Sequence, residues 1–227
     1  VKIQRQFTEN AAHELRTPLS LMQVQLDLYN SGKHPGNDAD TIQTIKMVTE
    51  QNERLSKMVK TLLDMSELQT VGRDDEIMVD ALVDEVLADL DPLAQEKNIK
   101  LTGKCKNITM VGSDILIYRL VYNLVENAIK YNHSGGQVSV EAYQREKQVY
   151  LSVKDTGNGI PEELKERVFE PFFRVDKSRS RELGGVGLGL ALVNEIVRVH
   201  DGSIAIRPNP SGGTIIEVEF SVNRTTA

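Results

Sequence analysis

Two long amphipathic stretches, separated by a short turn, constrain the fold of this chain more than any other feature. Residues 1–31 place apolar side chains three, four or seven positions apart, which is typical of one face of a helix. Residues 39–69 repeat them at the 3.5-residue spacing of coiled coils. Residues 31–38, between the two, contain glycine and proline, which end helices. The two stripes consist of Phe7, Ala11, Leu15, Met22, Leu26 and Tyr29, followed by Ile45, Val48, Leu55, Val59 and Leu62.

This pattern predicts an antiparallel helical hairpin over residues 1–69. A hairpin alone buries little apolar surface, so we expect two copies of the chain to pair into a four-helix bundle, a homodimer. The alternative is that the stripe of the second helix packs against the rest of the same chain.

A polar linker at residues 70–75 separates the hairpin from a region with a different pattern, residues 76–224. There, helical patterns interleave with short alternating runs that resemble paired strands. We expect a two-layer α/β sandwich with a mixed sheet and helices on one face, so that the whole chain has an α+β, multidomain fold. The predicted helices span residues 80–97, 114–131 and 187–200, and the predicted strands span residues 99–102, 108–111, 138–143, 149–153, 203–207 and 214–220.

The composition is that of a globular protein and excludes several classes. The chain has 227 residues, 40% of them apolar and 26% charged, enough for one large or two modest domains. A net charge of −6 argues against broad nucleic-acid binding, which needs a basic surface. Cys105 is the only cysteine, so no disulfide forms within the chain, and we expect Cys105 to be a small residue in or near a strand.

No apolar run reaches ~18 residues and no signal peptide is recognisable, so we expect no membrane contact. Because the chain starts in helical periodicity without Met, we interpret it as an excerpt of a longer protein.

The segment His13-Glu14-Leu15-Arg16-Thr17-Pro18-Leu19 places a histidine, an acid and a hydroxyl on one helical turn. His13 lies about 200° around the helix from Ala11, away from the apolar stripe, so its imidazole should be exposed. Neutral imidazole is available as a nucleophile near neutral pH. Pro18 removes a backbone hydrogen bond to the carbonyl of Glu14 and should bend the helix. The segment predicts a reactive histidine; the alternative is a surface histidine without function.

Polar side chains recur on one face of the apolar helix predicted over residues 114–131. Asn123, Asn127 and Lys130 are four and three positions apart, which places them above one another. Asparagine carbonyl oxygens suit Mg²⁺, and lysine supplies a point charge for phosphates. Tyr131 follows and can pack against a base. The spacing indicates a site for Mg²⁺ and phosphate; a hydrogen-bonded asparagine pair in the core is the alternative.

Two glycine-rich segments follow this helix in the sequence. Asp155-Thr156-Gly157-Asn158-Gly159-Ile160 follows a strand, where a carboxylate can accept a hydrogen bond from an exocyclic amine such as that of adenine. The glycines let the backbone approach a ligand closely. Gly184-Gly185-Val186-Gly187-Leu188-Gly189 runs into a helix, whose N-terminus favours anions. Each segment alone also fits an ordinary turn, and Gly189 also fits a packing role.

A long irregular stretch, residues 157–185, lies between the two glycine-rich segments. Loops of this length are often lids. Aromatic anchors beside basic residues suit a flap over an anionic ligand; a solvated surface loop is the alternative. These residues are Phe169, Pro171, Phe172 and Phe173, and then Arg174, Lys177, Arg179 and Arg181.

Taken together, these motifs occur in one order from Phe7 to Phe220, and the chain resembles the two-component sensor histidine kinases. The branch that it resembles joins a dimerising phosphoacceptor hairpin to an ATP-binding domain. The resemblance implies a Bergerat-type α/β sandwich that holds ATP between the N-box helix and a mobile lid. The matching segments are residues 13–19 for the phosphoacceptor box, 123–131 for the N box, 155–159 and 185–189 for the glycine boxes, and 169–174 for the phenylalanine box.

The resemblance also implies a mechanism. ATP phosphorylates His13, whose imidazole Glu14 orients so that Nε2 attacks, and the phosphoryl group passes to an aspartate of a response-regulator receiver domain. Thr17 would serve a phosphatase activity toward that partner. Asn127, with Asn123 nearby, would hold Mg²⁺. The residues implied in nucleotide binding are Asn123, Asn127, Lys130, Tyr131, Asp155, Gly157, Gly159, Ile160, Phe173, Arg174, Gly185, Gly187, Leu188 and Gly189.

The partner should contact the exposed residues beyond His13, namely Gln23, Gln25 and Asp27, and facing positions of the second helix. The family implies a cytoplasmic location, as the cytoplasmic part of a membrane-bound sensor.

Two rival interpretations remain open: an ATPase of the same superfamily that drives a conformational clamp, and a non-catalytic dimeric scaffold that binds nucleotide for control. The hydrolytic relatives carry a glutamate at the place of Asn123, and an asparagine amide cannot take a proton from water.

Overall fold

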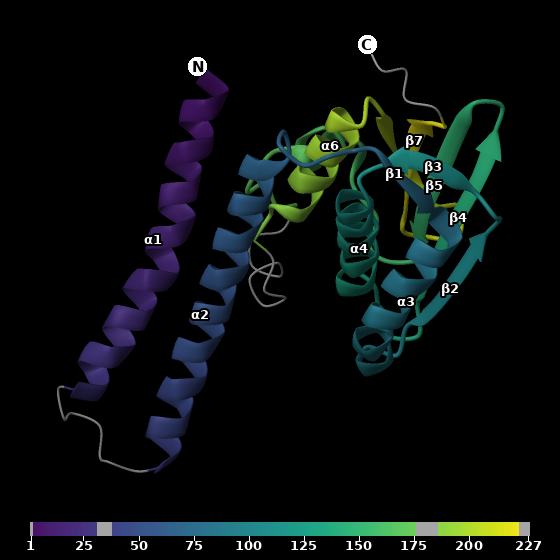
Figure 1. Ribbon diagram of the computed structural model, residues 1–227. Coiled ribbons are helices and arrows are strands. Elements are labelled where there is room, and N and C mark those ends of the chain that lie inside the picture. Colours follow the sequence, from purple (N-terminus) through teal and green to yellow (C-terminus); the bar gives the residue numbers. More distant parts are fainter. Residues whose placement is uncertain (1, 31–37, 176–185, 223–227) are drawn as a thin grey trace.

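Two long helices lie side by side and form the predicted hairpin (Figure 1). Helix α1 spans Lys2–Asn30 and helix α2 spans Asp38–Glu67, close to the predicted bounds. The turn expected at residues 31–38 lies almost entirely outside the described residues. The computed structural model describes residues 2–30, 38–175 and 186–222.

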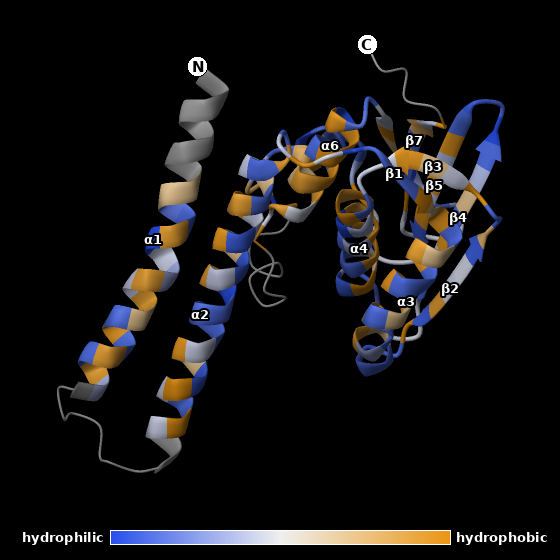
Figure 2. Cartoon of the chain, in the orientation of Figure 1, coloured by the Kyte–Doolittle hydropathy of each residue, from blue (hydrophilic) through white to orange (hydrophobic). Residues whose placement is uncertain are grey.

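The apolar stripes of the hairpin are only partly covered within one chain. Met58 of α2 is fully buried, whereas Leu26 is 42% exposed, Ile45 60% and Val59 43%. The coloured parts of α1 and α2 carry both apolar and polar positions (Figure 2). Leu62 therefore packs within the chain, as the alternative for the second stripe has it, while Ile45 stays on the surface.

The remainder of the chain contains a five-stranded sheet in the order β2-β4-β5-β7-β6. Strands β2 and β4 are parallel, and the other neighbours are antiparallel, so the predicted mixed sheet is confirmed. Cys105 ends β2 and is half-buried, as expected. The strands are β2 (Lys100–Cys105), β4 (Gln137–Arg145), β5 (Gln148–Asp155), β6 (Ser203–Pro208) and β7 (Thr214–Ser221).

Three helices cover one face of this sheet. Along β4, Val138, Val140 and Ala142 are buried and the residues between them are not, because successive side chains point to opposite faces of a sheet. The buried side chains pack with those of the helices in one apolar core, which gives the two-layer α/β sandwich expected from the sequence. The helices are α3 (Val79–Glu96), α4 (Asp114–Lys130) and α6 (Gly189–Val199).

A second, two-stranded sheet was not predicted. Strand β1, Asp75–Met78, pairs antiparallel with β3, Thr109–Gly112. Only Ile77 of β1 is buried, and Asp75 and Glu76 are exposed. Four residues with a single inward side chain show no readable alternation, so the sequence assigned Asp75 to a linker.

The segment predicted as a lid has some regular structure. Two 3₁₀ turns, Glu162–Leu164 and Arg167–Phe169, occupy its first half, and Lys177, Arg179, Arg181 and Gly185 lie outside the described residues. Helix α6 begins two residues later than expected. Gly187 has φ +78°, and a Cβ there would lie 2.7 Å from the carbonyl oxygen of Phe173, so this residue belongs to a turn rather than to the helix.

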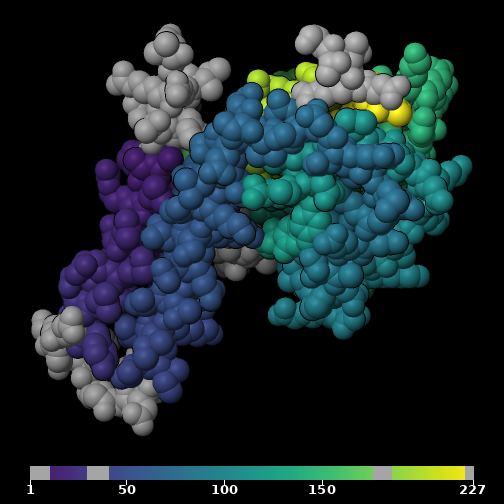
Figure 3. Space-filling view, viewed as in Figure 1, coloured from purple at the N-terminus to yellow at the C-terminus, as the bar shows by residue number. Residues whose placement is uncertain are grey.

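The hairpin packs against the sandwich through α2 (Figure 3). Met58, Val186 and Leu188 form a buried apolar cluster that joins α2 to the residues before α6. Asp64 of α2 pairs with Arg119 of α4, Oδ1 to Nη1, at 2.9 Å. In the described part of the chain, none of the helices combines the length and the apolar character needed to cross a membrane.

Candidate functional site

A cleft with a volume of about 370 Å³ opens between α4, α6 and the segments that follow β5. Most residues predicted to bind nucleotide line it, although they come from positions far apart in the sequence. Gly157 lies beside the cleft and does not line it, and Gly185 is outside the described residues. The predicted residues that line the cleft are Asn123, Asn127, Lys130, Tyr131, Asp155, Gly159, Ile160, Phe173, Arg174, Gly187, Leu188 and Gly189.

The asparagines of α4 lie against the first residue of α6. Asn123 Nδ2 donates a hydrogen bond to the carbonyl oxygen of Arg119 at 2.7 Å, which fixes the orientation of the amide. A Cβ on Gly189 would lie 3.0 Å from Asn123 Oδ1 and 3.5 Å from Asn127 Nδ2. Glycine at this position therefore lets the start of α6 approach both amides closely.

Glu126 also lines the cleft and was not predicted. Its Oε1 accepts hydrogen bonds from Lys130 Nζ at 2.7 Å and from Lys57 Nζ of the hairpin at 2.9 Å. Burial disfavours the charged carboxylate, but the two ammonium groups outweigh it and lower the pKa of Glu126. Burial, together with the nearby Lys57 charge, lowers the pKa of Lys130. The spacing of Glu126 and Lys130, four residues on a helix, was a visible signal for this pair.

Asp155 ends β5 at the floor of the cleft. Its Oδ1 accepts hydrogen bonds from the backbone N–H groups of Gly157 at 2.8 Å and of Thr214 at 3.2 Å. Burial raises the pKa of Asp155, and the two backbone donors oppose that rise. Gly157 thus acts by orienting the carboxylate, and a Cβ on it would lie 2.6 Å from the carbonyl oxygen of Tyr131.

Aromatic residues anchor the segment beside the cleft. The backbone N–H of Phe172 donates to the carbonyl oxygen of Gly187 at 2.7 Å, which ties the segment to the start of α6. The guanidinium of Arg167 lies 4.4 Å from the centre of the Phe173 ring, a cation–π distance. The predicted aromatic anchors therefore hold the side of the cleft formed by residues 167–175.

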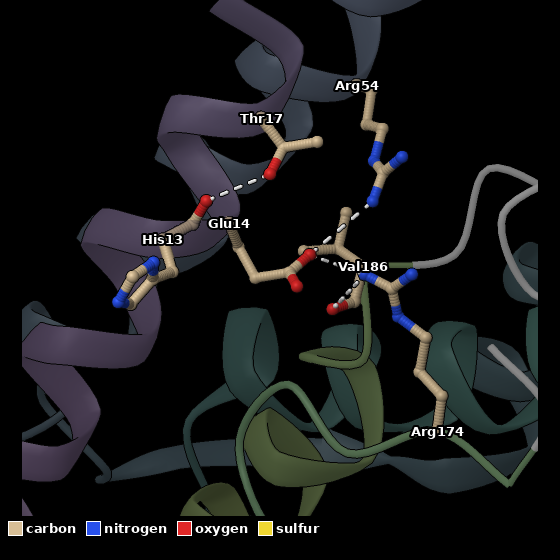
Figure 4. A network of polar contacts seen from close by, with 6 residues as sticks. All are labelled: His13, Glu14, Thr17, Arg54, Arg174 and Val186. Atoms are coloured by element: carbon tan, nitrogen blue, oxygen red, sulfur yellow. Dashed lines mark hydrogen bonds and ion pairs between the residues drawn. The ribbon is translucent and has the colours of Figure 1, made fainter. Parts of the chain in front are cut away.

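The histidine of the first motif is exposed on α1 (Figure 4). Glu14 points away from the imidazole of His13: its Oε2 lies 2.7 Å from Arg174 Nη2 and 3.5 Å from Arg54 Nη2. Thr17 Oγ1 donates to the carbonyl oxygen of His13 at 3.2 Å. The three predicted catalytic residues share one helical turn, and the acid connects that turn to the cleft wall through Arg174.

The fold and the site define an α/β sandwich with a cleft lined by Lys130 and Arg174, coupled to a hairpin with an exposed histidine. Two family models match the chain: the His Kinase A (phospho-acceptor) domain over residues 3–71, and the histidine kinase-, DNA gyrase B- and HSP90-like ATPase over residues 112–224. The chain belongs to the histidine kinases and carries their phosphoacceptor hairpin and ATP-binding domain.

Curated relatives agree with this assignment. The chain is 37% identical over 216 residues to the sensor-like histidine kinase SenX3 of Mycolicibacterium smegmatis, covering 92% of this chain and 55% of the relative. It is 34% identical over 223 residues to the signal transduction histidine-protein kinase ArlS of Staphylococcus aureus, covering 96% and 49%. The chain thus spans about half the length of the curated relatives that it matches.

Solved structures have the same fold. The histidine kinase ThkA in complex with the response regulator protein TrrA matches with a TM-score of 0.81 and 25% identity, over 100% of this chain and 64% of that chain. The Acinetobacter baumannii histidine kinase AdeS matches in fold with a TM-score of 0.76 and 24% identity, over 93% of this chain and 98% of that chain.

Proposed function

We propose that this chain transfers the γ-phosphoryl group of ATP to His13 and then to an aspartate of a response-regulator receiver domain. The observation that carries the proposal is the ion pair between Glu14, beside the exposed His13, and Arg174 in the wall of the cleft. It brings the histidine turn into direct contact with the cleft. The complex of ThkA with a response regulator supports a receiver domain as the partner.

In the first step, the phosphorylation of His13, a neutral imidazole acts as the nucleophile. The Nε2 lone pair of His13 attacks the γ-phosphorus, a P–N bond forms, and the bond to the bridging oxygen breaks so that ADP leaves with the electron pair. The Nδ1 proton must face an acceptor for Nε2 to present its lone pair, and Glu14 is the adjacent acid. Glu14 can serve only after it exchanges Arg174 for the imidazole.

In the cleft, Asp155 is the acceptor for the exocyclic amine of adenine, and Lys130 faces the phosphates. Asn127 and Asn123 fit Mg²⁺, because both side chains line the cleft and amide oxygens are hard ligands. Bound Mg²⁺ neutralises charge on the triphosphate. Since Asn123 cannot accept a proton from water, ATP hydrolysis should be slow, which argues against the rival ATPase.

The proposed organisation is a phosphoacceptor hairpin at residues 1–69, a linker at 70–75 and an ATP-binding domain at 76–224. The exposed Ile45 and Val59 support a homodimer formed through the hairpin, because a second copy would cover them. We also propose that this core is the cytoplasmic part of a longer, membrane-bound sensor, since the curated relatives are named as sensor kinases and are longer than this chain.

A phosphatase activity is the second proposal. Thr17 lies one turn after His13 and is exposed, and its hydroxyl is held near the His13 backbone. From there the hydroxyl can orient a water toward a phosphorylated receiver domain docked at this turn.

Incubation with γ-labelled ATP tests the main proposal. Wild type should acquire label that is lost in acid and kept in base, as a phosphoramidate is, and His13→Gln should acquire none while it still binds ATP. Label that survives this substitution contradicts the proposal. Steady ADP production without a labelled protein would favour the ATPase instead.

A further inference from the structure

The nucleotide cleft has one wall that does not belong to the sandwich. Lys57 and Thr61 of α2 line it together with α4. They are four residues apart, so both project from the same face of the helix. The cleft is therefore complete only when the hairpin is docked as it is in this structure.

Lys57 is held at the cleft by a carboxylate that it shares with a second lysine. Glu126 Oε1 lies 2.9 Å from Lys57 Nζ and 2.7 Å from Lys130 Nζ. The Glu126 side chain is 12% exposed and that of Lys130 is 17% exposed, whereas Lys57 is 50% exposed. Two ammonium groups against one carboxylate leave a positive charge at the cleft, and such a charge attracts anions.

We propose that Lys57 contacts the bound nucleotide: its ammonium leaves Glu126 and pairs with a phosphate oxygen while the hairpin stays docked. This inference rests on the proposed binding of ATP in the same cleft. Lysine has a flexible stem of four carbons, so the half-exposed ammonium can reach a new partner without movement of α2. Glu126 keeps Lys130 as its partner when Lys57 leaves, so the carboxylate is not left buried and unpaired.

A hairpin residue in the cleft couples nucleotide binding to docking. If Lys57 contributes to binding only in the docked arrangement, bound ATP must favour that arrangement by the same factor. One contact that holds the docked arrangement, the pair between Asp64 and Arg119, lies outside the cleft. Docking and nucleotide binding can therefore be perturbed separately.

The first test is a titration of the full chain with ATP and with adenosine. Lys57→Gln should raise the dissociation constant for ATP about two- to fivefold, as expected for a half-exposed charge pair, and leave adenosine binding unchanged. Lys60→Gln is the matched control, because Lys60 is exposed on the same helix, does not line the cleft and removes the same charge. Equal ATP affinities of the two variants would overturn the inference.

The second test repeats the Lys57 substitution in a chain whose docking is weakened. Asp64→Lys repels Arg119, should lower ATP affinity, and should make Lys57→Gln silent. An equal loss from Lys57→Gln in both backgrounds would show that Lys57 acts without docking and would overturn the inference. Asn127→Ala separates the two proposals: if it binds ATP like wild type, the proposed nucleotide cleft itself is wrong, whereas if it loses ATP and Lys57→Gln does not, only this inference fails.

Discussion

The carboxylate of Glu14 lies 2.7 Å from the guanidinium of Arg174, a residue 160 positions later in the chain. Arg174 is 6% exposed and Glu14 31%, so this pair is shielded from solvent more than a surface ion pair. It joins the helical turn of the exposed His13 to the wall of the cleft beside α4 and α6. The acid next to His13 is thereby held by the ATP-binding domain rather than by the imidazole.

The first prediction concerns Glu14 itself. Glu14→Gln keeps a hydrogen-bond acceptor but removes the negative charge, so autophosphorylation of His13 should fall by about 100-fold or more. ATP affinity should be kept or rise slightly, because Glu14 does not line the cleft and Arg174 is released. Initial rates of labelling and a nucleotide titration measure the two effects. Glu53→Gln, an exposed change on α2, serves as control, and wild-type labelling by Glu14→Gln would contradict the role.

Thr17 should separate the two activities. Thr17→Ala removes the hydroxyl that lies one turn from His13 and should abolish dephosphorylation of the phosphorylated receiver partner while autophosphorylation stays within about twofold of wild type. The decay of labelled partner measures the first activity and the labelling of the kinase the second. Thr49→Ala removes an exposed hydroxyl elsewhere on the hairpin and should change neither. An equal loss of both activities in Thr17→Ala would refute the assignment.

Asp155 should determine the recognition of adenine. In Asp155→Asn the amide oxygen can still accept the N–H groups of Gly157 and Thr214, so the fold should survive. The amide NH₂ replaces an acceptor by a donor, and the ATP dissociation constant should rise about 10- to 100-fold. Calorimetric titration measures this loss, with Asp74→Asn as an exposed control. A variant that bound ATP normally would rule out this contact.

Glu126 should make stability depend on pH. Although its burial acts in the opposite sense, the two lysines lower its pKa below the ordinary value of 4.5. A carboxyl whose pKa is lower in the folded state stabilises the fold fully above its unfolded pKa, and this contribution disappears as the pH falls through the folded pKa. Between about pH 6 and pH 3.5, the nucleotide-free chain should lose on the order of 1 kcal/mol more unfolding free energy than Glu126→Gln.

Urea unfolding at several pH values measures this difference. Glu50→Gln, at an exposed position of α2, should keep the wild-type pH dependence. Parallel pH profiles for wild type and Glu126→Gln would show that the ion pairs contribute nothing measurable.

The local pattern of apolar and polar residues was sufficient to predict most helices and strands of the fold. The apolar periodicity of residues 114–131 predicted α4, found at Asp114–Lys130, because its core-facing positions recur at every turn. The start of α6 was misplaced because the φ of Gly187 depends on the contact with Phe173, which no local pattern reveals. Strand β1 was missed for the complementary reason, since its single buried residue, Ile77, leaves no periodicity to detect.

Site residues could be predicted from the sequence where a single local motif contains them. Asn123 and Asn127 share one face of α4 because of helix geometry, and Asp155 could be recognised by its place at the end of a strand. Lys57 was missed because a charged residue on an amphipathic helix is usually solvated, and its pairing with Glu126, 69 residues later, depends on how the hairpin docks. The contact between Glu14 and Arg174 depends on the same docking.

Because residues of α2 form one wall of the cleft, a hairpin and a sandwich from two different proteins of this kind cannot be combined freely. A chimera that grafted the hairpin of a relative onto this sandwich would alter Lys57 and Thr61 along with the residues that choose the partner. Its nucleotide affinity would change together with its signalling specificity. Recombination between such proteins should therefore preserve this face of α2 with the sandwich it came from.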